Sequence, residues 1–138
     1  MRMNTYVNFR GQCAEAFSYY ERHLGAKVDM MMTHGQSPDQ SPVGSEWKDA
    51  VLHARILIAD AELMAADIPN AEPMRSAYLT LRMDSNTEAE RVFAALSDGG
   101  RVLMPIEETF FAFRFGQVQD RFGINWMILH ERALSPQQ

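Results

Sequence analysis

A chain of 138 residues, 46% of them hydrophobic and 22% charged, is long enough to bury one globular core, and we expect a single domain. Its formal net charge of −5 argues against a nucleic-acid partner, because neutralising phosphates requires clustered lysine and arginine side chains. No apolar run approaches the roughly 18 residues needed to span a bilayer, so we expect no membrane partner.

The opening residues and the cysteine content predict a cytoplasmic location. The segment over residues 1–5 lacks the apolar core of a signal peptide. Cys13 is the single cysteine, so it can form neither an internal disulfide nor a thiolate metal site by itself. A helix start can lower the pKa of a thiol, but without a histidine or acid motif nearby we do not expect Cys13 to act as a nucleophile.

The hydrophobic pattern of the first half predicts one strand, one helix and three further strands. The helix carries apolar residues at intervals of three and four, and Gly25 follows where a left-handed residue would end it. The expected elements are a strand over residues 5–9, a helix over 12–24, and strands over 26–33, 51–59 and 61–67.

The same order returns after a linker over residues 68–75 that contains two prolines. The expected elements are a strand over residues 77–83, a helix over 87–96, and strands over 101–104, 109–117 and 124–130. Two copies of one small unit, each too thin to bury its own sheet, predict repeat units of about 4–67 and 77–131 within one domain over 1–138.

The predicted fold class is α+β, with tandem βαβββ units whose strands form a curved mixed sheet and whose helices lie on the outer face. Alternation along the strands supports this prediction. Leu79 and Leu81 share one apolar face, whereas Tyr78 and Arg82 share the other. A mixed concave face opposite the helices is a plausible ligand trough.

Several short motifs carry a resemblance to a known family. They are YVNFRG at 6–11, AEAF at 14–17, LG at 24–25, ETF at 108–110, DRFG at 120–123 and WM at 126–127. With them the chain resembles the vicinal-oxygen-chelate (glyoxalase, bleomycin-resistance and dioxygenase) superfamily, and in particular its PhnB-like branch. The resemblance extends from about Thr5 to His130 and implies a glyoxalase-like fold. Phe111 departs from the branch, which usually carries tryptophan there.

Enzymes of this superfamily typically hold a divalent metal with side chains from the first and last strands of each unit. The resemblance places these positions at Thr5, Met64, Tyr78 and Met127. None is a good ligand for a hard or borderline cation, because the set offers hydroxyls and thioethers. We therefore expect no metal and no other cofactor.

Two residues are candidates for catalysis. His53 can shuttle a proton, and its alternative role is a polar residue that lines the trough or hydrogen-bonds a neighbour. Glu108 can act as a general base or bind a ligand, and its alternative role is to hold the turn at Thr109 in place.

The candidate ligand-binding residues are Tyr78, Arg55, Arg82, Arg114, Phe110 and Trp47. The three arginines fall on the polar side of the strand alternation, so a concave surface shared by them, Tyr78, His53 and Glu108 would favour a small anion. Solvated or paired arginines are the alternative. Trp47 can serve as a lid or can pack on a partner subunit.

Three functions stay open. The first is a PhnB-like glyoxalase-fold protein that binds a small molecule, with anions among the candidates, in the trough without a standard metal centre. The second is a metal-dependent lyase, isomerase or dioxygenase with a non-standard ligand set, and the third is a structural or regulatory dimer. The missing metal ligands favour the first over the second. A homodimer is expected because paired units often close the trough in this superfamily, and the absence of a glycine-rich nucleotide loop argues against a methyltransferase.

Overall fold

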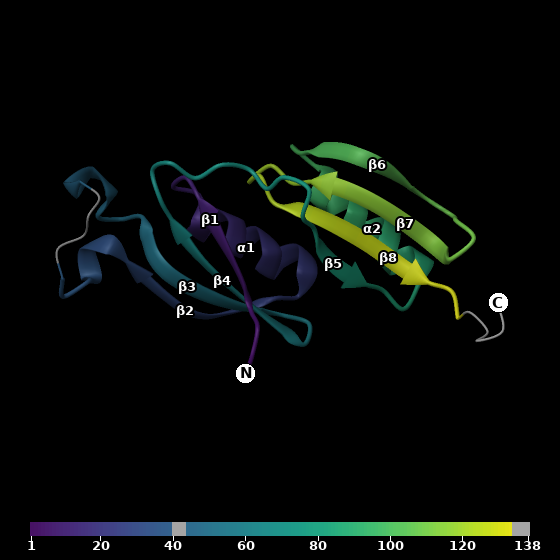
Figure 1. Ribbon diagram of the computed structural model, residues 1–138, viewed down its shortest axis with the longest axis horizontal. Coiled ribbons are helices and arrows are strands. Elements are labelled where there is room, and N and C mark those ends of the chain that lie inside the picture. Colours follow the sequence, from purple (N-terminus) through teal and green to yellow (C-terminus); the bar gives the residue numbers. More distant parts are fainter. Residues whose placement is uncertain (40–43, 134–138) are drawn as a thin grey trace. The chain divides into compact units, whose positions relative to one another are not determined.

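The computed structural model describes residues 1–39 and 44–133, and the chain divides into two compact units, Met1–Glu72 and Pro73–Gln138 (Figure 1). The boundary falls inside the predicted linker. Among the residues described, each unit contains one α-helix and one four-stranded sheet. None of the described helices is long and apolar enough to cross a membrane.

The first unit has the predicted order of one strand, one helix and three strands. Its elements are β1 (Thr5–Phe9), α1 (Cys13–Leu24), β2 (Lys27–Thr33), β3 (Val51–Ile58) and β4 (Ala61–Asp67), with the 3-10 helices η1 (His34–Gln36) and η2 (Ser45–Trp47) between β2 and β3. The strand order is β1-β4-β3-β2, with β1 parallel to β4 and the other pairs antiparallel. Every strand and α-helix of this unit begins and ends within one residue of the predicted bounds.

The second unit repeats the arrangement. Its elements are β5 (Leu79–Arg82), α2 (Asn86–Ser97), β6 (Arg101–Glu107), β7 (Ala112–Gln119) and β8 (Asn125–Glu131). The strand order is β5-β8-β7-β6, and β5 is parallel to β8. The predicted α+β fold of two βαβββ units is confirmed, with the strands hydrogen-bonded in two mixed four-stranded sheets.

Strand β6 is three residues longer than expected, because it continues through Pro105 to Glu107. Proline cannot donate to a ladder and is therefore confined to edge strands or bulges. Strand β6 is an edge strand, and its pairing with β7 shifts register between Met104 and Glu107. Both features accommodate the proline.

Local signals explain where the helices begin and end. Helix α1 buries Ala16, Phe17 and Tyr20 on one stripe and ends at Gly25, which adopts the left-handed conformation with φ 62°. At the start of α2 the Ser85 side chain accepts a hydrogen bond from the Glu88 backbone N–H at 3.1 Å. Both helices thus pack an apolar stripe on their own sheets.

A buried carboxylate ties the first unit together. Asp67, at the end of β4, is 1% exposed. Its Oδ1 accepts hydrogen bonds from the backbone N–H groups of Gly11 (2.9 Å) and Cys13 (3.0 Å), and its Oδ2 accepts one from Val51 (2.9 Å). One side chain therefore joins the start of α1, the start of β3 and the end of β4.

Candidate functional site

In the first unit, α1 packs on one face of the sheet and leaves the opposite face uncovered by any helix of that unit. Strand register assigns the residues: Val7, Ile56 and Leu63 are buried on the α1 side, and the residues that alternate with them point away from α1. We call this second surface the open face. It carries Tyr6, Lys27, Met30, Met32, His53, Arg55, Leu57, Glu62 and Met64.

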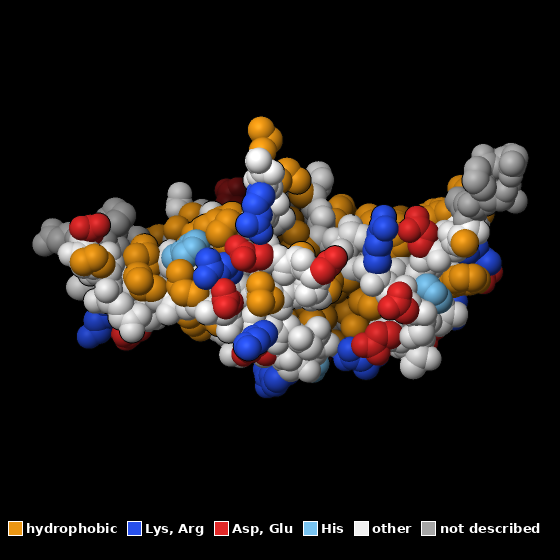
Figure 2. All heavy atoms as spheres, turned by 90° about the horizontal axis from the view of Figure 1, so that it is seen from below, with side chains coloured by type: hydrophobic (Ala, Val, Ile, Leu, Met, Phe, Trp, Pro, Cys, Tyr) orange, Lys and Arg blue, Asp and Glu red, His pale blue; other side chains and the backbone are white. Residues whose placement is uncertain are grey.

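The open face combines three methionines and one leucine with Tyr6, His53 and three charged side chains. Met30 pairs in register with Arg55, Met32 with His53, and Met64 with Tyr6. In the space-filling view, hydrophobic side chains adjoin a histidine and charged groups over the first unit (Figure 2). A surface of this composition can receive an apolar molecule and orient it through few hydrogen bonds.

Tyr6 and His53 form the central polar pair of the open face. The Tyr6 hydroxyl lies 3.3 Å from Nδ1 of His53. Their rings stack, with centroids 5.7 Å apart and an interplanar angle of 24°. Burial, with a smaller contribution from Cys13, raises the pKa of the Tyr6 hydroxyl, so this group stays protonated at neutral pH and can donate to the imidazole.

Arg55 is balanced by two carboxylates. Its Nε lies 2.8 Å from Oδ2 of Asp29 and 3.9 Å from Oε2 of Glu62. Glu62 also accepts a hydrogen bond from the Asn4 amide at 3.1 Å. For this arginine the paired alternative therefore holds, and the open face has no cationic patch at Arg55.

An open hollow of about 700 Å³ adjoins the open face. Leu57 and Glu62 belong to both surfaces. The remaining lining residues are Arg2, Met3, Asn4, Thr5, Ala59, Asp60 and Ala61. None of the predicted site residues lines this hollow.

In the second unit, register places Arg82 on the face away from α2. Arg82 pairs with Leu129, and Thr80 with Met127, whereas Ile128 between them is buried. Tyr78 lies just before β5 and continues the alternation of Thr80 and Arg82. The Arg82 side chain is 77% exposed and lies 3.9 Å from Glu131, so it contributes a loosely paired charge.

The predicted face of Arg114 is wrong, because this residue lies on the side of its sheet that α2 covers. Its Nε donates to Oε1 of Glu90, on α2, at 2.8 Å. Gly116, two residues along β7, faces α2 as well: a Cβ there would lie 2.7 Å from the Phe93 ring. Strand β7 also shifts register between Ala112 and Arg114. Strand alternation therefore assigned the wrong face, and the arginine reaches the surface of α2 from the covered side of its sheet.

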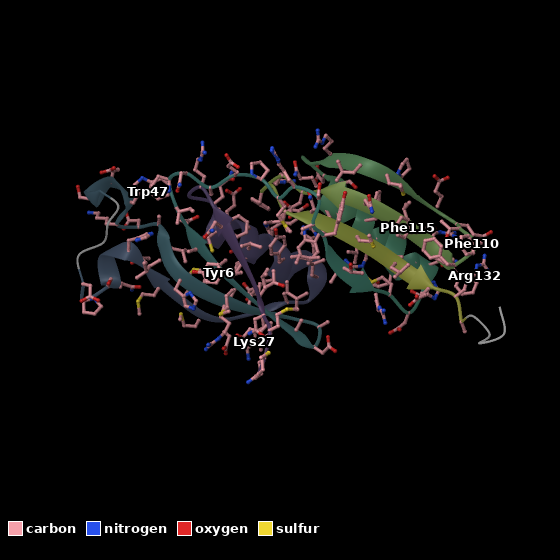
Figure 3. The ribbon with its side chains drawn as sticks, viewed as in Figure 1. Tyr6, Lys27, Trp47, Phe110, Phe115 and Arg132 are labelled. Carbon is pink, nitrogen blue, oxygen red and sulfur yellow. The ribbon has the colours of Figure 1, made fainter. Side chains whose placement is uncertain are left out.

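Glu108 and Phe110 lie at the turn between β6 and β7. Glu108 forms an ion pair with Arg132 at 3.0 Å, and Arg132 Nε donates to the Thr109 carbonyl at 3.3 Å. The Arg132 guanidinium also lies 4.4 Å from the Phe113 ring centroid. Phe110 projects from this turn with 85% of its surface exposed, near Phe115 and Arg132 in Figure 3. These contacts support the turn-stabilising role of Glu108, and its catalytic role stays a prediction.

Trp47 is placed apart from the Tyr6–His53 pair. It ends η2, and its ring lies 3.8 Å from the position that a Cβ on Gly11 would occupy. Trp47 therefore packs on the turn between β1 and α1 of its own unit, and Figure 3 shows it away from Tyr6.

The side chains at the four expected metal positions are poor ligands for a divalent metal. Thr5 pairs with Leu63 and so lies on the α1 side, whereas its neighbour Tyr6 pairs with Met64 on the open face. Within residues 1–39 and 44–133 no three histidine, cysteine, aspartate or glutamate side chains converge in a way that could hold a metal ion. Hydroxyl and thioether donors do not fit zinc, iron or manganese.

The structure thus groups the predicted site residues by unit. His53 and Arg55 share the open face of the first unit, and Tyr78 and Arg82 share the uncovered side of the second; that all of them line one surface stays a prediction. Tyr6 is the residue that sequence reasoning missed. The alternation of Val7 and Phe9 could have placed it on the polar side, but its contact with His53 depends on strand register.

Known proteins are similar in sequence to this chain along nearly its whole length. A family model described as 3-demethylubiquinone-9 3-methyltransferase matches residues 1–129. Protein YjdN from Escherichia coli (strain K12) is 35% identical over 139 residues, which cover 93% of this chain and 94% of YjdN.

Two solved structures resemble the chain over a similar length. The crystal structure of protein PA1353 from Pseudomonas aeruginosa has a TM-score of 0.85 at 40% identity and covers 96% of this chain and 99% of its own. The PhnB protein from Bacillus cereus has a TM-score of 0.79 at 21% identity and covers 94% of this chain and 99% of its own. The second likeness concerns the fold.

Proposed function

We propose that this chain, which belongs to the 3-demethylubiquinone-9 3-methyltransferase (PhnB/YjdN) family of the glyoxalase fold, binds a small molecule on the open face of its first unit. Membership of a family does not establish a reaction. Each sheet has one parallel pair and two antiparallel pairs, whereas a methyl-donor fold would be built on a parallel sheet with alternating helices. Binding is the activity that the geometry of the open face supports best.

The observation that carries this proposal is the Tyr6–His53 pair on a surface that also carries Met30, Met32, Met64 and Leu57. Burying apolar surface contributes about 25 cal/mol per Å². The half-exposed side chains of Met32, Leu57 and Met64 would contribute in this way when a ligand covers them. The paired phenol and imidazole would then fix the orientation of the ligand.

Nuclear magnetic resonance of protein labelled at the methionine methyl groups tests the proposal directly. We expect acetophenone, a small aromatic ketone, to shift the methyl signals of Met30, Met32 and Met64 in a saturable manner. The signal of Met104, on the edge strand β6 of the second unit, is the internal reference.

An Arg114→Gln variant is the matched control, because Arg114 lies on the α2 side of the other sheet, and it should bind acetophenone as the native protein does. Shifts confined to Met127, or no saturable shift at the solubility limit, would contradict the proposal. Elemental analysis of the purified protein addresses the alternative enzyme: one retained divalent metal per chain, with binding abolished by a chelator, would favour a metal-dependent reaction.

A further inference from the structure

We infer that the ligand of the open face is an uncharged apolar molecule with one hydrogen-bond-accepting oxygen, such as a ketone or ester, received by the Nε2–H group of His53. This inference rests on the proposed function and adds the chemical class of the ligand.

The contact with Tyr6 favours one of the two tautomers of the His53 imidazole. A neutral imidazole has one donor nitrogen and one acceptor nitrogen. A phenol hydroxyl donates more readily than it accepts, so this contact at 3.3 Å favours the tautomer in which Nδ1 accepts and the proton resides on Nε2. Among residues 1–39 and 44–133 no group hydrogen-bonds to Nε2, which leaves this N–H as a donor for a bound molecule.

The charges of the open face argue against an anion. Arg55 already contacts Asp29 at 2.8 Å and Glu62 at 3.9 Å. An anionic ligand would have to compete with both carboxylates for the guanidinium, and would approach two like charges in doing so. Lys27, which pairs in register with Leu57, is the second cation of this face, so two basic groups balance two acidic groups.

The apolar part of the ligand follows from the methionines. Met32 lies directly across from His53, and Met30 and Met64 flank Arg55. Thioether side chains are flexible and polarisable and make favourable contacts with aromatic rings. The stacked ring of Tyr6 adds a further aromatic surface. A flat or ring-containing molecule with a single acceptor fits this combination.

Three probes of similar size separate the possibilities in the methionine-methyl titration: acetophenone has a neutral acceptor, ethylbenzene has none, and benzoate is an anion. We expect acetophenone to bind about 3- to 10-fold more tightly than ethylbenzene, which is the usual contribution of one hydrogen bond. Benzoate should bind more weakly than acetophenone, with little dependence on salt. A His53→Phe variant keeps the aromatic bulk and should abolish the preference for acetophenone over ethylbenzene.

The imidazole proton provides an independent measurement. Long-range ¹H–¹⁵N spectra of the native protein should show the Nε2–H form of His53 at neutral pH. Tyr6→Phe removes the donor to Nδ1 and should increase the Nδ1–H population.

Three results would overturn the inference in distinguishable ways. Tightest binding of benzoate, weakened steeply by salt, would show an anion site while leaving the proposed binding function standing. A dominant Nδ1–H form in the native protein would remove the donor on which the inference depends. Failure of all three probes to shift Met30, Met32 and Met64 would contradict the proposed function itself, and this inference with it.

Discussion

At the scale of single residues, the Asp67 side chain has the largest structural role that we assign in the first unit, because three backbone N–H groups donate to its carboxylate. It is almost fully buried and accepts three backbone hydrogen bonds from two different segments, the turn that leads into α1 and the start of β3. Both carboxylate oxygens are used, so neither can be replaced by a donor without leaving an N–H group unpaired. Its main-chain carbonyl also lies 3.1 Å from Nε2 of His34.

We therefore expect Asp67→Asn to lower the free energy of unfolding by about 1–3 kcal/mol, the cost of a buried polar group without its partner. Urea denaturation followed by circular dichroism measures the change. Asp49→Asn, at an exposed position, is the control and should stay within about 0.5 kcal/mol of the native protein. Equal stability of the two variants would contradict the assigned role.

The start of a helix generally lowers the pKa of a thiol, but the pKa of Cys13, at the start of α1, is raised. Burial, together with the nearby Asp67 carboxylate, raises the pKa of the Cys13 thiol from its ordinary value of 9.0 to about 12. The thiol is therefore protonated at neutral pH, which agrees with the expectation that it is not a nucleophile.

This shift predicts a pH dependence of stability. The folded state keeps the proton between pH 9 and about 12, whereas the unfolded state loses it, so stability decreases as pH rises through this window. Because Cys13→Ala lacks the titrating thiol, the stability difference between the native protein and this variant should shrink above pH 9, by at most about 1.4 kcal/mol per pH unit. Rapid alkylation of the folded protein by iodoacetamide at pH 8 would contradict the raised pKa.

At the scale of elements, Gly116 controls how closely α2 approaches its sheet. A Cβ at this position would lie 2.7 Å from the Phe93 ring and 2.9 Å from Cα of Ile106. The second of these is a backbone atom of β6, which cannot move without displacing the strand. The absence of a side chain at one residue of β7 thus allows both α2 and β6 to pack.

Gly116→Ala should accordingly lower the unfolding free energy by about 1–3 kcal/mol through overpacking. Gly44→Ala is a suitable comparison, because the atoms nearest to its Cβ would be the carboxylate of exposed Glu46, which can rotate away, and its φ of −68° suits any residue. The measurement is the denaturation midpoint of each variant. A destabilisation by Gly44→Ala as large as that by Gly116→Ala would show that local backbone strain, and not the contact with α2, sets the cost.

At the scale of the whole molecule, we propose that the chain is a homodimer. Each sheet ends in two edge strands, β1 and β2 in the first unit and β5 and β6 in the second, and open edges favour pairing between chains. Apolar side chains are exposed along β6 and its turn, notably Val102, Met104 and Phe110.

Light scattering at micromolar concentration should therefore give twice the mass of one chain, and a monomer would contradict the proposal. Phe110→Ser should weaken the dimer while leaving the fold of the unit intact, because the side chain is 85% exposed. Far-ultraviolet circular dichroism of this variant is the control for folding.

The order of the elements was predictable because it depends on signals that are local in sequence. Strand alternation, the apolar stripe of α1 and the turn residues Gly25 and Ser85 each act within a few positions. The strand through Pro105 was predicted too short, since only the position of β6 at the edge of its sheet makes a proline acceptable there. The sequence identified candidate site residues by their chemistry and strand position, but it predicted less well which residues they contact.

The sequence by itself determined the repeat, the fold class and the family, because periodicity and short motifs survive without knowledge of long-range contacts. Only the tertiary structure decided that Tyr6 meets His53, that Arg55 is balanced by Asp29, and that Arg114 reaches Glu90 on α2. Each of these pairs joins segments 24 to 47 residues apart. Their contacts depend on strand register and on the face that a helix covers, and the local sequence pattern of a single strand determines neither property.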